Sequence, residues 1–301
     1  MVSASAPRTA CAARAWLATL TIALLGLGGA ARAAETTLAE RGEYVFHAAS
    51  CAGCHTDVEN DGAPLAGGRR LPTPFGTFVS PNITPDPTHG IGAWSEADLE
   101  RALRHGEGPG WFDHYYPVFP YPSYTRMSGE DVRALWAYLR TVEPVARENE
   151  PHEIPWYLRI RVAAWGWKLL FFEPGEFTPD PARSGEWNRG AYLVRALSHC
   201  GECHTPRDGF GVSIGSRELA GSADGAEGKA TPNITPHEAD GVGRWSKREL
   251  REYLHVGMDP DGDFAGGLMA EVVDESLAHL RIEDIDAIVE YLVSLPPLPS
   301  D

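Results

Sequence analysis

Two short stretches of this 301-residue sequence decide its fold: Cys51-Ala52-Gly53-Cys54-His55 and Cys200-Gly201-Glu202-Cys203-His204. Both are followed by threonine, and both are preceded by the pattern Arg-Gly-x-Tyr, at residues 41–44 and 189–192. A five-residue motif that recurs together with its upstream neighbours indicates an internal duplication of the chain.

The duplication continues downstream of both motifs. Each copy contains Pro-Asn-Ile-Thr-Pro, at residues 81–85 and 232–236, and then Trp-Ser, at residues 94–95 and 245–246. The asparagine and the tryptophan are separated by the same number of residues in the two copies. Because chance does not maintain such a register, the sequence predicts two homologous domains.

Signals for short helices, separated by long loops, dominate both copies. Ser95 and Ser246 each precede an acidic residue three positions later, which is the capping-box pattern at the start of a helix. Gly106 and Gly257 stand where those helices are expected to end. Further helices are expected to begin at Ser128 and near residue 283, whereas residues 58–80 and 207–230 are rich in glycine and proline and are expected to be loops.

A bridging segment, residues 144–186, separates the copies. Within it, apolar side chains recur at helical spacing from Trp156 to Phe171, which predicts a helix over residues 155–172 that packs across both domains. Arg159, Arg161 and Lys168 lie in the same stretch and argue against a helix buried in a membrane.

Residues 1–33 have the pattern of a secretory signal peptide. Arg8 and Arg14 precede an apolar run that is short for a transmembrane span, and Ala31-Arg32-Ala33 supplies a small-residue cleavage site. The sequence therefore predicts export to the periplasm, and a leader retained as a membrane anchor is the alternative. Cys11 leaves with a cleaved leader, so that only the cysteines of the two motifs remain.

The pattern Cys-x-x-Cys-His is the attachment signature of haem c. Its two thiols bond the vinyl groups of the porphyrin, and the adjacent histidine turns its imidazole toward the iron. A thioredoxin-like dithiol does not need the histidine, and a zinc site made from two cysteine pairs does not need one after each pair. We therefore predict two covalently attached haem c groups. The predicted attachment residues are Cys51, Cys54, Cys200 and Cys203, and the predicted iron ligands beside them are His55 and His204.

Over nearly the whole chain after the leader, the sequence resembles the two-haem, class I-like cytochrome c family, which includes the cytochrome c subunits of exported dehydrogenases and their soluble relatives. The most specific resemblance is carried by residues 81–85, 90–95, 116–121, 199–207 and 266–273. The resemblance implies an all-α fold of two tandem class I cytochrome c-like domains, at residues 36–143 and 187–298, joined by a helical linker at 144–186. It also implies that electrons pass from a donor dehydrogenase to an acceptor cytochrome or oxidase of the respiratory chain.

The second axial ligands need a separate argument, because a haem that shuttles electrons usually has one and methionine in this place raises its potential. In copy two, Met269 lies in a loop before the last helix, where class I cytochromes place this ligand, whereas Met258 directly follows a helix end and is expected only to pack. In copy one, Phe119 occupies the place within residues 116–121 where some relatives of this family carry the methionine ligand, and phenylalanine cannot bind iron. Relatives with phenylalanine there often carry a later methionine, which makes Met127 the predicted ligand. His114, another histidine or no ligand at all are the alternatives.

Electron transfer without substrate chemistry is the predicted function, because no nucleophile, acid–base pair or nucleotide-binding loop stands out. The alternative is a dihaem enzyme, peroxidase-like or thiosulfate-oxidising, with a reactive first haem, and Phe119 is its support in the sequence. The formal net charge of −16 argues against a nucleic-acid partner and favours a basic protein surface, although acidity also keeps an exported protein soluble. The basic residues of the linker are expected to neutralise haem propionates or to face a partner, and peripheral membrane association is left open.

Overall fold

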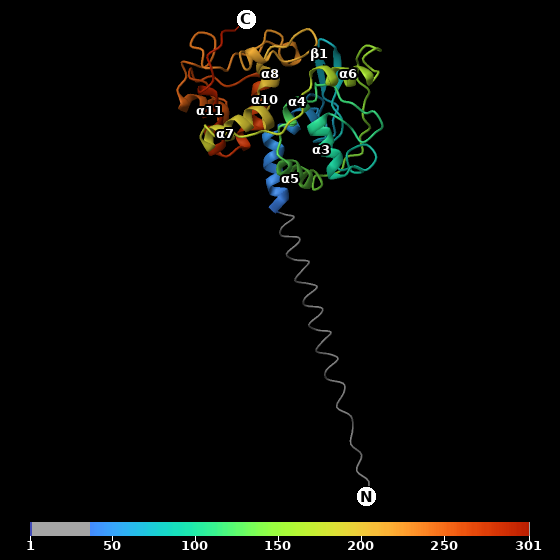
Figure 1. The fold of residues 1–301 in the computed structure, drawn as a ribbon. Coiled ribbons are helices and arrows are strands. Elements are labelled where there is room, and N and C mark those ends of the chain that lie inside the picture. The colour runs from blue at the N-terminus through green and yellow to red at the C-terminus, as the bar shows by residue number, and fades with distance from the viewer. Residues whose placement is uncertain (2–36, 301) are drawn as a thin grey trace.

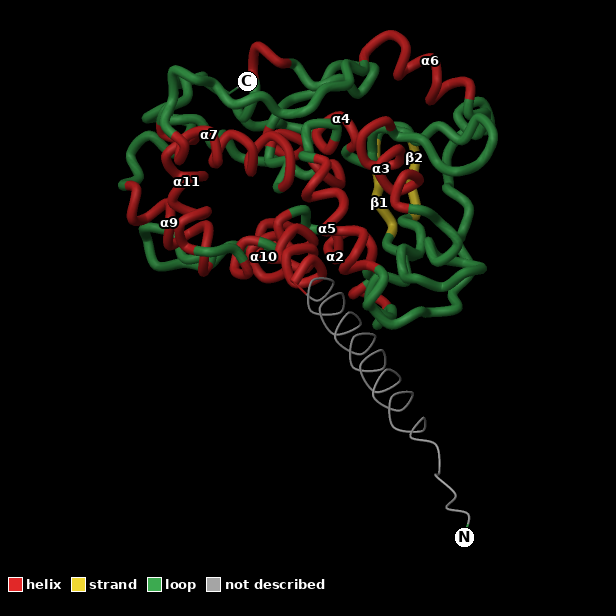
Figure 2. The backbone as a smooth tube through the Cα atoms, turned by 60° about the horizontal axis from the view of Figure 1, so that its bottom comes forward, coloured by secondary structure: helices red, strands yellow, loops and turns green. Residues whose placement is uncertain are grey.

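The computed structural model describes Met1 and residues 37–300 of the chain, so that the predicted leader lies outside the described residues apart from Met1. The first described helix, residues 37–48, lies between two lobes, one built from the first half of the sequence and the other from the second half (Figure 1). In a second view, α2, α5 and α10 lie in the middle of the molecule, between the lobe that contains α9 and α11 and the lobe that contains α3 and the two strands (Figure 2).

Short helices joined by long loops make up both halves. The first half contains α2 (Cys51–His55), η1 (Val58–Asn60), β1 (Arg70–Thr73), β2 (Gly76–Val79), α3 (Glu96–His105), α4 (Tyr121–Tyr124) and α5 (Gly129–Leu139), and α6 (Val162–Phe171) follows in the bridging segment. The second half contains α7 (Gly185–Tyr192), η2 (Leu193–Leu197), α8 (Gly201–His204), η3 (Gly215–Arg217), η4 (Ala226–Gly228), α9 (Lys247–Val256), α10 (Gly267–Glu275), η5 (Leu277–His279) and α11 (Ile282–Val293).

The predicted ends of the helices α3 and α9 are confirmed. The side chains of Ser95 and Ser246 accept a hydrogen bond from the backbone N–H three residues later, and the acidic residue at that position completes both capping boxes. Gly106 and Gly257 end these helices in the left-handed conformation, with φ angles of 61° and 79°. The side chain of Ser128 also accepts the N–H three residues later, in α5, but without the reciprocal bond of a capping box.

In each half, the helix before the cysteine motif crosses the last helix at a glycine. A methyl group on Gly42 would stand 1.9 Å from the carbonyl oxygen of Ala134 in α5. A methyl group on Gly190 in α7 would stand at the same 1.9 Å from the carbonyl oxygen of Ala287 in α11. Only glycine permits backbones to approach so closely. The glycine of the repeated Arg-Gly-x-Tyr pattern therefore lies at an equivalent helix crossing in each half.

The tyrosines of the same pattern connect the two halves. The hydroxyl of Tyr44 donates to the carboxylate of Asp284 in α11 and accepts the N–H at the N-cap of that helix, at 3.3 Å. The hydroxyl of Tyr192 donates to Oδ2 of Asp131 in α5 at 2.6 Å and accepts the N–H at the N-cap of that helix, at 3.1 Å. Each tyrosine thus satisfies the first turn of the last helix of the other half. We call Tyr44, Asp284, Tyr192 and Asp131 the tyrosine clasp.

Arginines hold the two carboxylates of the tyrosine clasp from within their own halves. Arg189 donates to Asp284 through Nε and Nη2, at 2.8 and 2.6 Å, and Arg41 donates to Asp131 through Nη2, at 2.8 Å. Burial alone would raise the pKa of Asp284, but the hydrogen bonds from Arg189 and Tyr44 and the charge of Arg189 outweigh it and lower the pKa. The reciprocal contacts fix the orientation of one half against the other.

The structure departs from the all-helical prediction at residues 70–79, where a loop was expected. β1 and β2 pair as an antiparallel hairpin, with Arg70 opposite Val79. Phe78 and Val79 are buried, and the backbone of Thr77 bridges to Glu153 in the linker. The fold is therefore mostly helical rather than purely so, and the long-range contact with Glu153 left no local signal for the hairpin.

The predicted linker helix is shorter than expected. It spans α6 rather than residues 155–172, and Trp156 and Ile160, which were expected on its packed face, lie in the preceding turns and are exposed. The buried side of α6 carries Ala164, as the helical spacing predicts, together with Lys168. Helical spacing was therefore misleading at the N-terminal end of this stretch, because Pro155 is followed by turns instead of a helix.

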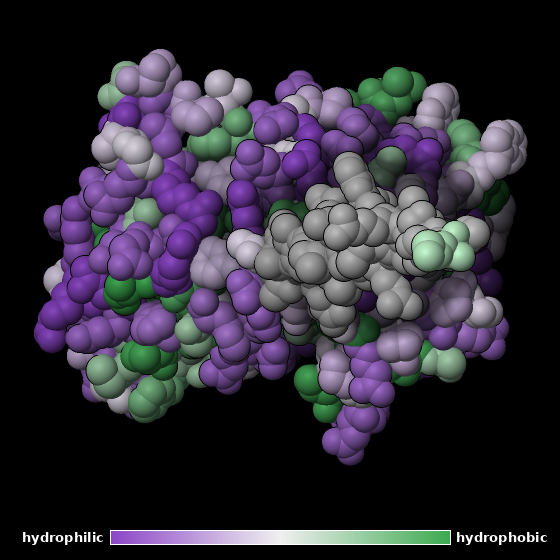
Figure 3. Space-filling model, turned by 90° about the horizontal axis from the view of Figure 1, so that it is seen from below, coloured by the Kyte–Doolittle hydropathy of each residue, from purple (hydrophilic) through white to green (hydrophobic). Residues whose placement is uncertain are grey.

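Apolar side chains gather on the surface around α6. Trp156, Ile160, Leu169 and Leu170, which we call the α6 apolar face, are each more than half exposed. α6 lies at the end of the molecule away from the start of the helix at residues 37–48 (Figure 1). Seen from that start, the surface of the second half is largely hydrophilic (Figure 3). Along residues 37–300, no helix combines the length and the apolar character needed to cross a membrane.

Candidate functional site

Each Cys-x-x-Cys-His motif lies on a short helix, α2 or α8, that is set off from the helix before it. The residue ahead of the first cysteine has a left-handed backbone in both halves, with φ of 51° at Ser50 and 38° at His199. The cysteines in the described part of the chain are free thiols. Burial raises the pKa of both Cys51 and Cys200 to about 12. The raised pKa follows from burial of the sulfur away from water, so that both thiols lie inside the protein.

The loop that carries Pro-Asn-Ile-Thr-Pro orients the histidine of each motif. Nδ1 of His55 lies 2.8 Å from the carbonyl oxygen of Pro81, and Nδ1 of His204 lies 2.8 Å from that of Pro232. A carbonyl oxygen only accepts, so Nδ1 carries the proton and Nε2 keeps its lone pair. Burial lowers the pKa of both imidazoles, which favours the neutral ring. Each histidine is thus prepared to bind iron through Nε2.

A buried asparagine holds each of these loops in place. Oδ1 of Asn82 accepts from both the N–H and the hydroxyl of Thr84, at 2.9 and 2.7 Å, and Oδ1 of Asn233 accepts the same pair from Thr235, at 2.8 and 2.7 Å. The amide nitrogens donate to the chain that follows each last helix, at Val145 and Leu298 respectively. The two Asn-x-Thr sequences therefore serve hydrogen bonding within and around these loops.

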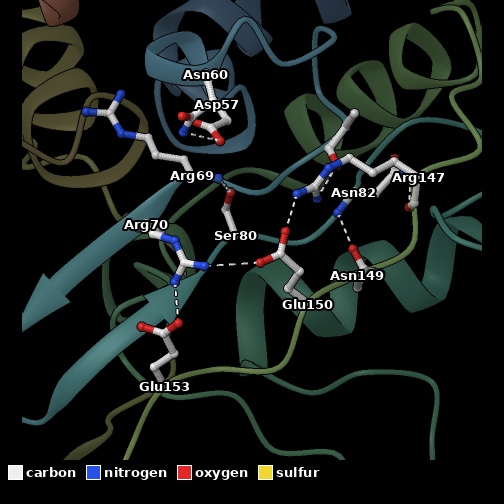
Figure 4. Close-up of polar contacts among 11 residues, drawn as sticks. Asp57, Asn60, Arg69, Arg70, Ser80, Asn82, Arg147, Asn149, Glu150 and Glu153 are labelled. Carbon is white, nitrogen blue, oxygen red and sulfur yellow. Dashed lines mark hydrogen bonds and ion pairs between the residues drawn. The ribbon is translucent and has the colours of Figure 1, made fainter.

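Ion pairs brace the same loop of the first half from outside (Figure 4). Arg70 of β1 donates to Glu150 and Glu153 of the linker, at 3.3 and 2.6 Å. Arg147 donates to Glu150 at 2.6 Å, and the carboxamide of Asn149 accepts the backbone N–H of Asn82 at 2.7 Å. The linker thereby ties the hairpin to the loop that presents Pro81.

Arg69 bridges the first motif to the second half of the chain. Its Nη1 donates to the carbonyl oxygen of Gly53, inside the first motif, at 2.6 Å. The same guanidinium binds the carboxylates of Glu227 and Glu271, which both belong to the second half. Its side chain is only 10% exposed, so these contacts are largely shielded from water.

Side chains from the first half also reach the second motif. The hydroxyl of Tyr124 donates to the carbonyl oxygen of Ala49 at 2.8 Å, and the ring of Tyr124 lies 5.3 Å from that of His199, next to Cys200. Ser123 donates to Glu202 inside the second motif, at 2.5 Å. Residues 123–124 of the first half therefore lie between the surroundings of the two motifs.

The predicted distal residues occupy different surroundings. The loop predicted around Met269 is the helix α10 instead, and Met269 is partly buried against the hydrophobic core. Met127, directly before the N-cap of α5, is completely buried with 0% exposure. Phe119 packs edge-on against Tyr115 and Tyr124, with ring centroids 5.9 and 5.8 Å apart.

His114 lies in a cluster of charged side chains beside α6. Its Nδ1 is 3.3 Å from Nζ of Lys168, and Nζ also binds Oε1 of Glu107 at 2.9 Å. Burial, and after it the positive charge of Lys168, lowers the pKa of His114. The imidazole is therefore neutral near pH 7 and its Nδ1 is engaged by the linker.

The residues of both motifs fit haem c. Two free thiols, two residues apart, precede an imidazole whose Nε2 is available, and this arrangement occurs once in each half. Within residues 37–300, no three side chains of Cys, His, Asp or Glu gather so as to hold a metal ion among themselves. Fold and site together define a c-type cytochrome.

Known proteins of similar sequence support this class. Residues 39–143 match the cytochrome c family. The chain is 47% identical to a protein of Cereibacter sphaeroides described as "Diheme cytochrome c-type", over 86% of this chain and 86% of that protein. The chain therefore belongs to the two-haem cytochrome c family, and its cofactors are two covalently bound haem c groups.

Two further relatives are subunits of dehydrogenases. The chain is 42% identical to the gluconate 2-dehydrogenase cytochrome c subunit of Pantoea cypripedii, over 87% of this chain and 60% of that subunit. It is 39% identical to the alcohol dehydrogenase (quinone) cytochrome c subunit of Gluconacetobacter polyoxogenes, over 88% of this chain and 58% of that subunit. The chain thus spans about three fifths of the length of these subunits.

Two features of the structure were not predicted from the sequence. One is the pair of carbonyl groups, at Pro81 and Pro232, that orient the motif histidines, and the other is the pair of clasp tyrosines, Tyr44 and Tyr192. A signal for both was present, because all four residues belong to stretches that recur in the two copies and that haem attachment alone did not explain.

Proposed function

We propose that this chain is a periplasmic electron carrier that accepts electrons from a partner dehydrogenase and delivers them to an acceptor cytochrome or oxidase of the respiratory chain. The observation that carries the proposal is the repeated Cys-x-x-Cys-His motif with Nε2 of the histidine left available in both halves. Relatives that are named as cytochrome c subunits of dehydrogenases support the direction of transfer. The acidic charge of the chain suits a basic partner surface.

In this proposal, bound haem supplies the one-electron iron couple, and the residues of the chain hold and orient it. Thioether bonds form at Cys51 and Cys54 for the first haem and at Cys200 and Cys203 for the second, with His55, His204 and Met269 as iron ligands. We assign the haems to two tandem cytochrome c domains, residues 36–143 and 187–298, joined by residues 144–186, after a signal peptide of residues 1–33. The twin glycine crossings and the tyrosine clasp support two equivalent domains.

The α6 apolar face is the surface that we assign to the partner dehydrogenase. Exposed apolar patches of this kind are uncommon on proteins that act alone. Phe210 of the second half is exposed beside it, and its carbonyl oxygen accepts from Nε1 of Trp167 at 2.9 Å, so that the surface joins both halves. The variant Leu169→Glu/Leu170→Glu is expected to slow reduction by the dehydrogenase at least about tenfold while both haem spectra stay unchanged. Unchanged reduction, or loss of binding to lipid vesicles instead, contradicts a protein partner at this face.

The electron-carrier proposal is tested on the holoprotein purified from the periplasmic fraction. Potentiometric titration is expected to show two one-electron steps, and neither hydrogen peroxide nor thiosulfate is expected to be turned over. Recovery of the protein only from the cytoplasm, or steady turnover of either substrate without a partner, would contradict the proposal.

A dihaem enzyme remains the second candidate, and one observation favours it. Phe119, which has no atom that can bind iron, stands in the segment where a methionine ligand is expected for the first haem. A haem with a free coordination position can react with small molecules, whereas a haem with two protein ligands transfers electrons only.

A further inference from the structure

The segments that follow α3 and α9 each fold back onto the end of their helix through an equivalent hydrogen bond. The N–H of Tyr115 donates to the carbonyl oxygen of the glycine that ends α3, at 2.8 Å, and the N–H of Ala265 donates to that of the glycine that ends α9, at 2.7 Å. Four residues beyond these points stand Phe119 in the first half and Met269 in the second. Counted from these hydrogen bonds, Phe119 therefore occupies the position of Met269.

The last helices, α5 and α11, provide a second comparison of the halves. Their N-caps are Ser128 and Arg281, and the carboxylate of the tyrosine clasp stands three residues beyond each N-cap. The residue before the N-cap is Met127 in the first half and Leu280 in the second. Each donates its N–H to the carbonyl three residues earlier, at 2.9 and 3.1 Å, and their exposed fractions are 0% and 3%.

Met127 therefore fills a packing position. Leucine has no atom that can bind iron, so this position cannot supply a ligand in the second half, where Met269 is available instead. The other methionine within residues 1–143 is Met1, in the predicted leader. A methionine ligand for the first haem would thus have to come from a position that serves the core in the other half.

His114 is also unsuited to bind iron. An ammonium group has no lone pair, so Lys168 approaches Nδ1 of His114 as a donor, at 3.3 Å. This contact favours the neutral tautomer with its proton on Nε2, and Nε2 could bind iron only after Nδ1 gives up its contact with Lys168. The motif histidines show the opposite arrangement, because carbonyl oxygens hold the proton on Nδ1 and leave Nε2 available.

We propose that the first haem lacks a methionine ligand and that its distal side, at Phe119, is a binding site for small neutral ligands of the size of carbon monoxide. This inference rests on the proposed attachment of that haem at Cys51 and Cys54. It replaces the prediction that Met127 binds the iron. The two haems are then unequal: the second relays electrons, and the first also binds ligands.

Titration of the reduced holoprotein with carbon monoxide tests the inference, with total haem measured as the pyridine haemochrome. The wild-type protein is expected to bind one carbon monoxide per two haems. Met127→Leu places the residue of the equivalent position, Leu280, in the first half and is expected to leave this ratio unchanged. Phe119→Met supplies a sulfur where Met269 stands and is expected to abolish binding. Met269→Leu is expected to raise binding to two carbon monoxide molecules per two haems.

Three results would overturn the inference. In the first, the wild-type protein binds no carbon monoxide and Met127→Leu gains it, which makes Met127 the ligand. In the second, neither protein binds it, which makes a histidine or another side chain the ligand. In the third, Phe119→Met retains binding at the first haem with full haem content. Fewer than two haems per chain would instead contradict the attachment on which the inference rests. Leucine conserves the volume of Met127, so the Met127→Leu protein is expected to fold.

Discussion

Removal of one hydroxyl group from the tyrosine clasp is expected to lower the free energy of unfolding of the whole protein. Tyr192→Phe deletes the hydroxyl that donates to Asp131 at 2.6 Å and accepts the N–H of Ser128 at 3.1 Å. Both side chains are nearly enclosed, with 8% of Tyr192 and 9% of the Asp131 side chain exposed. Water therefore cannot easily replace the lost partner.

The size of the effect follows from the two hydrogen bonds. A hydrogen bond to a charged group contributes about 1.5–3 kcal/mol and a neutral one about 1 kcal/mol. Asp131 keeps its bond to Arg41, so its charge stays compensated and the loss in the free energy of unfolding is expected to be about 3 kcal/mol. For a chain of this size, that corresponds to a fall of about 6–12 °C in the melting temperature.

Thermal unfolding of the holoprotein, followed by far-ultraviolet circular dichroism, measures this loss. Tyr157→Phe is the matched control, because Tyr157 is 55% exposed and its change is expected to stay within about 0.5 kcal/mol of the wild-type protein. Haem content is expected to be normal in both variants, since neither residue belongs to a motif. Equal melting temperatures for the two variants would refute the assignment of the clasp as the joint between the halves.

Three further perturbations have distinct expected outcomes. Asn233→Ala removes the hydrogen bonds to Thr235 and Leu298 and is expected to cost about 2–4 kcal/mol of unfolding free energy; voltammetry is expected to show a shifted potential for the second haem only, and an unshifted one would contradict the role of this loop. Gly190→Ala places a methyl 1.9 Å from a carbonyl oxygen and is expected to cost about 3 kcal/mol or more in denaturant unfolding, whereas Gly185→Ala, in open space on the same helix, is expected to be neutral. The pKa of Asp284 is lowered in the folded state, so its contribution to stability is complete above the ordinary value of 3.8 and is lost as the pH falls through the folded value. Acid titration of unfolding is expected to show this loss in the wild-type protein and a flatter profile in Asp284→Asn, and identical profiles would contradict the ion pair.

Local features of the chain could be predicted from the sequence because their causes are local. The capping boxes at Ser95 and Ser246 and the glycine stops depend on residues within one helix, and they are confirmed. Haem attachment is equally local, since the chemistry needs two thiols and an imidazole at fixed spacing. The duplication allowed each of these features to be checked in the other copy.

Features that depend on distant partners could not be predicted. Tyr44 and Asp284 are 240 positions apart, and His55 meets Pro81 across 26 positions, so neither contact has a periodic signature. The linker helix was predicted too long because Trp156 and Ile160 have the spacing of a buried helical face, and spacing alone does not show that both are exposed. The residue at the distal side of the first haem could not be assigned from the sequence alone. The segment between the hydrogen bond after α3 or α9 and the N-cap of the last helix differs in length in the two halves, so the halves can be compared only from both ends of that segment.

Mass spectrometry of the purified holoprotein, intact and after proteolysis, decides whether two covalent haems are bound where we assign them. The expected result is an intact mass two haems above that of the polypeptide, together with one haem on the peptide that contains Cys51 and Cys54 and one on the peptide that contains Cys200 and Cys203. A haem-free peptide from either motif, or haem that is extracted by acidified solvent, would contradict the assignment.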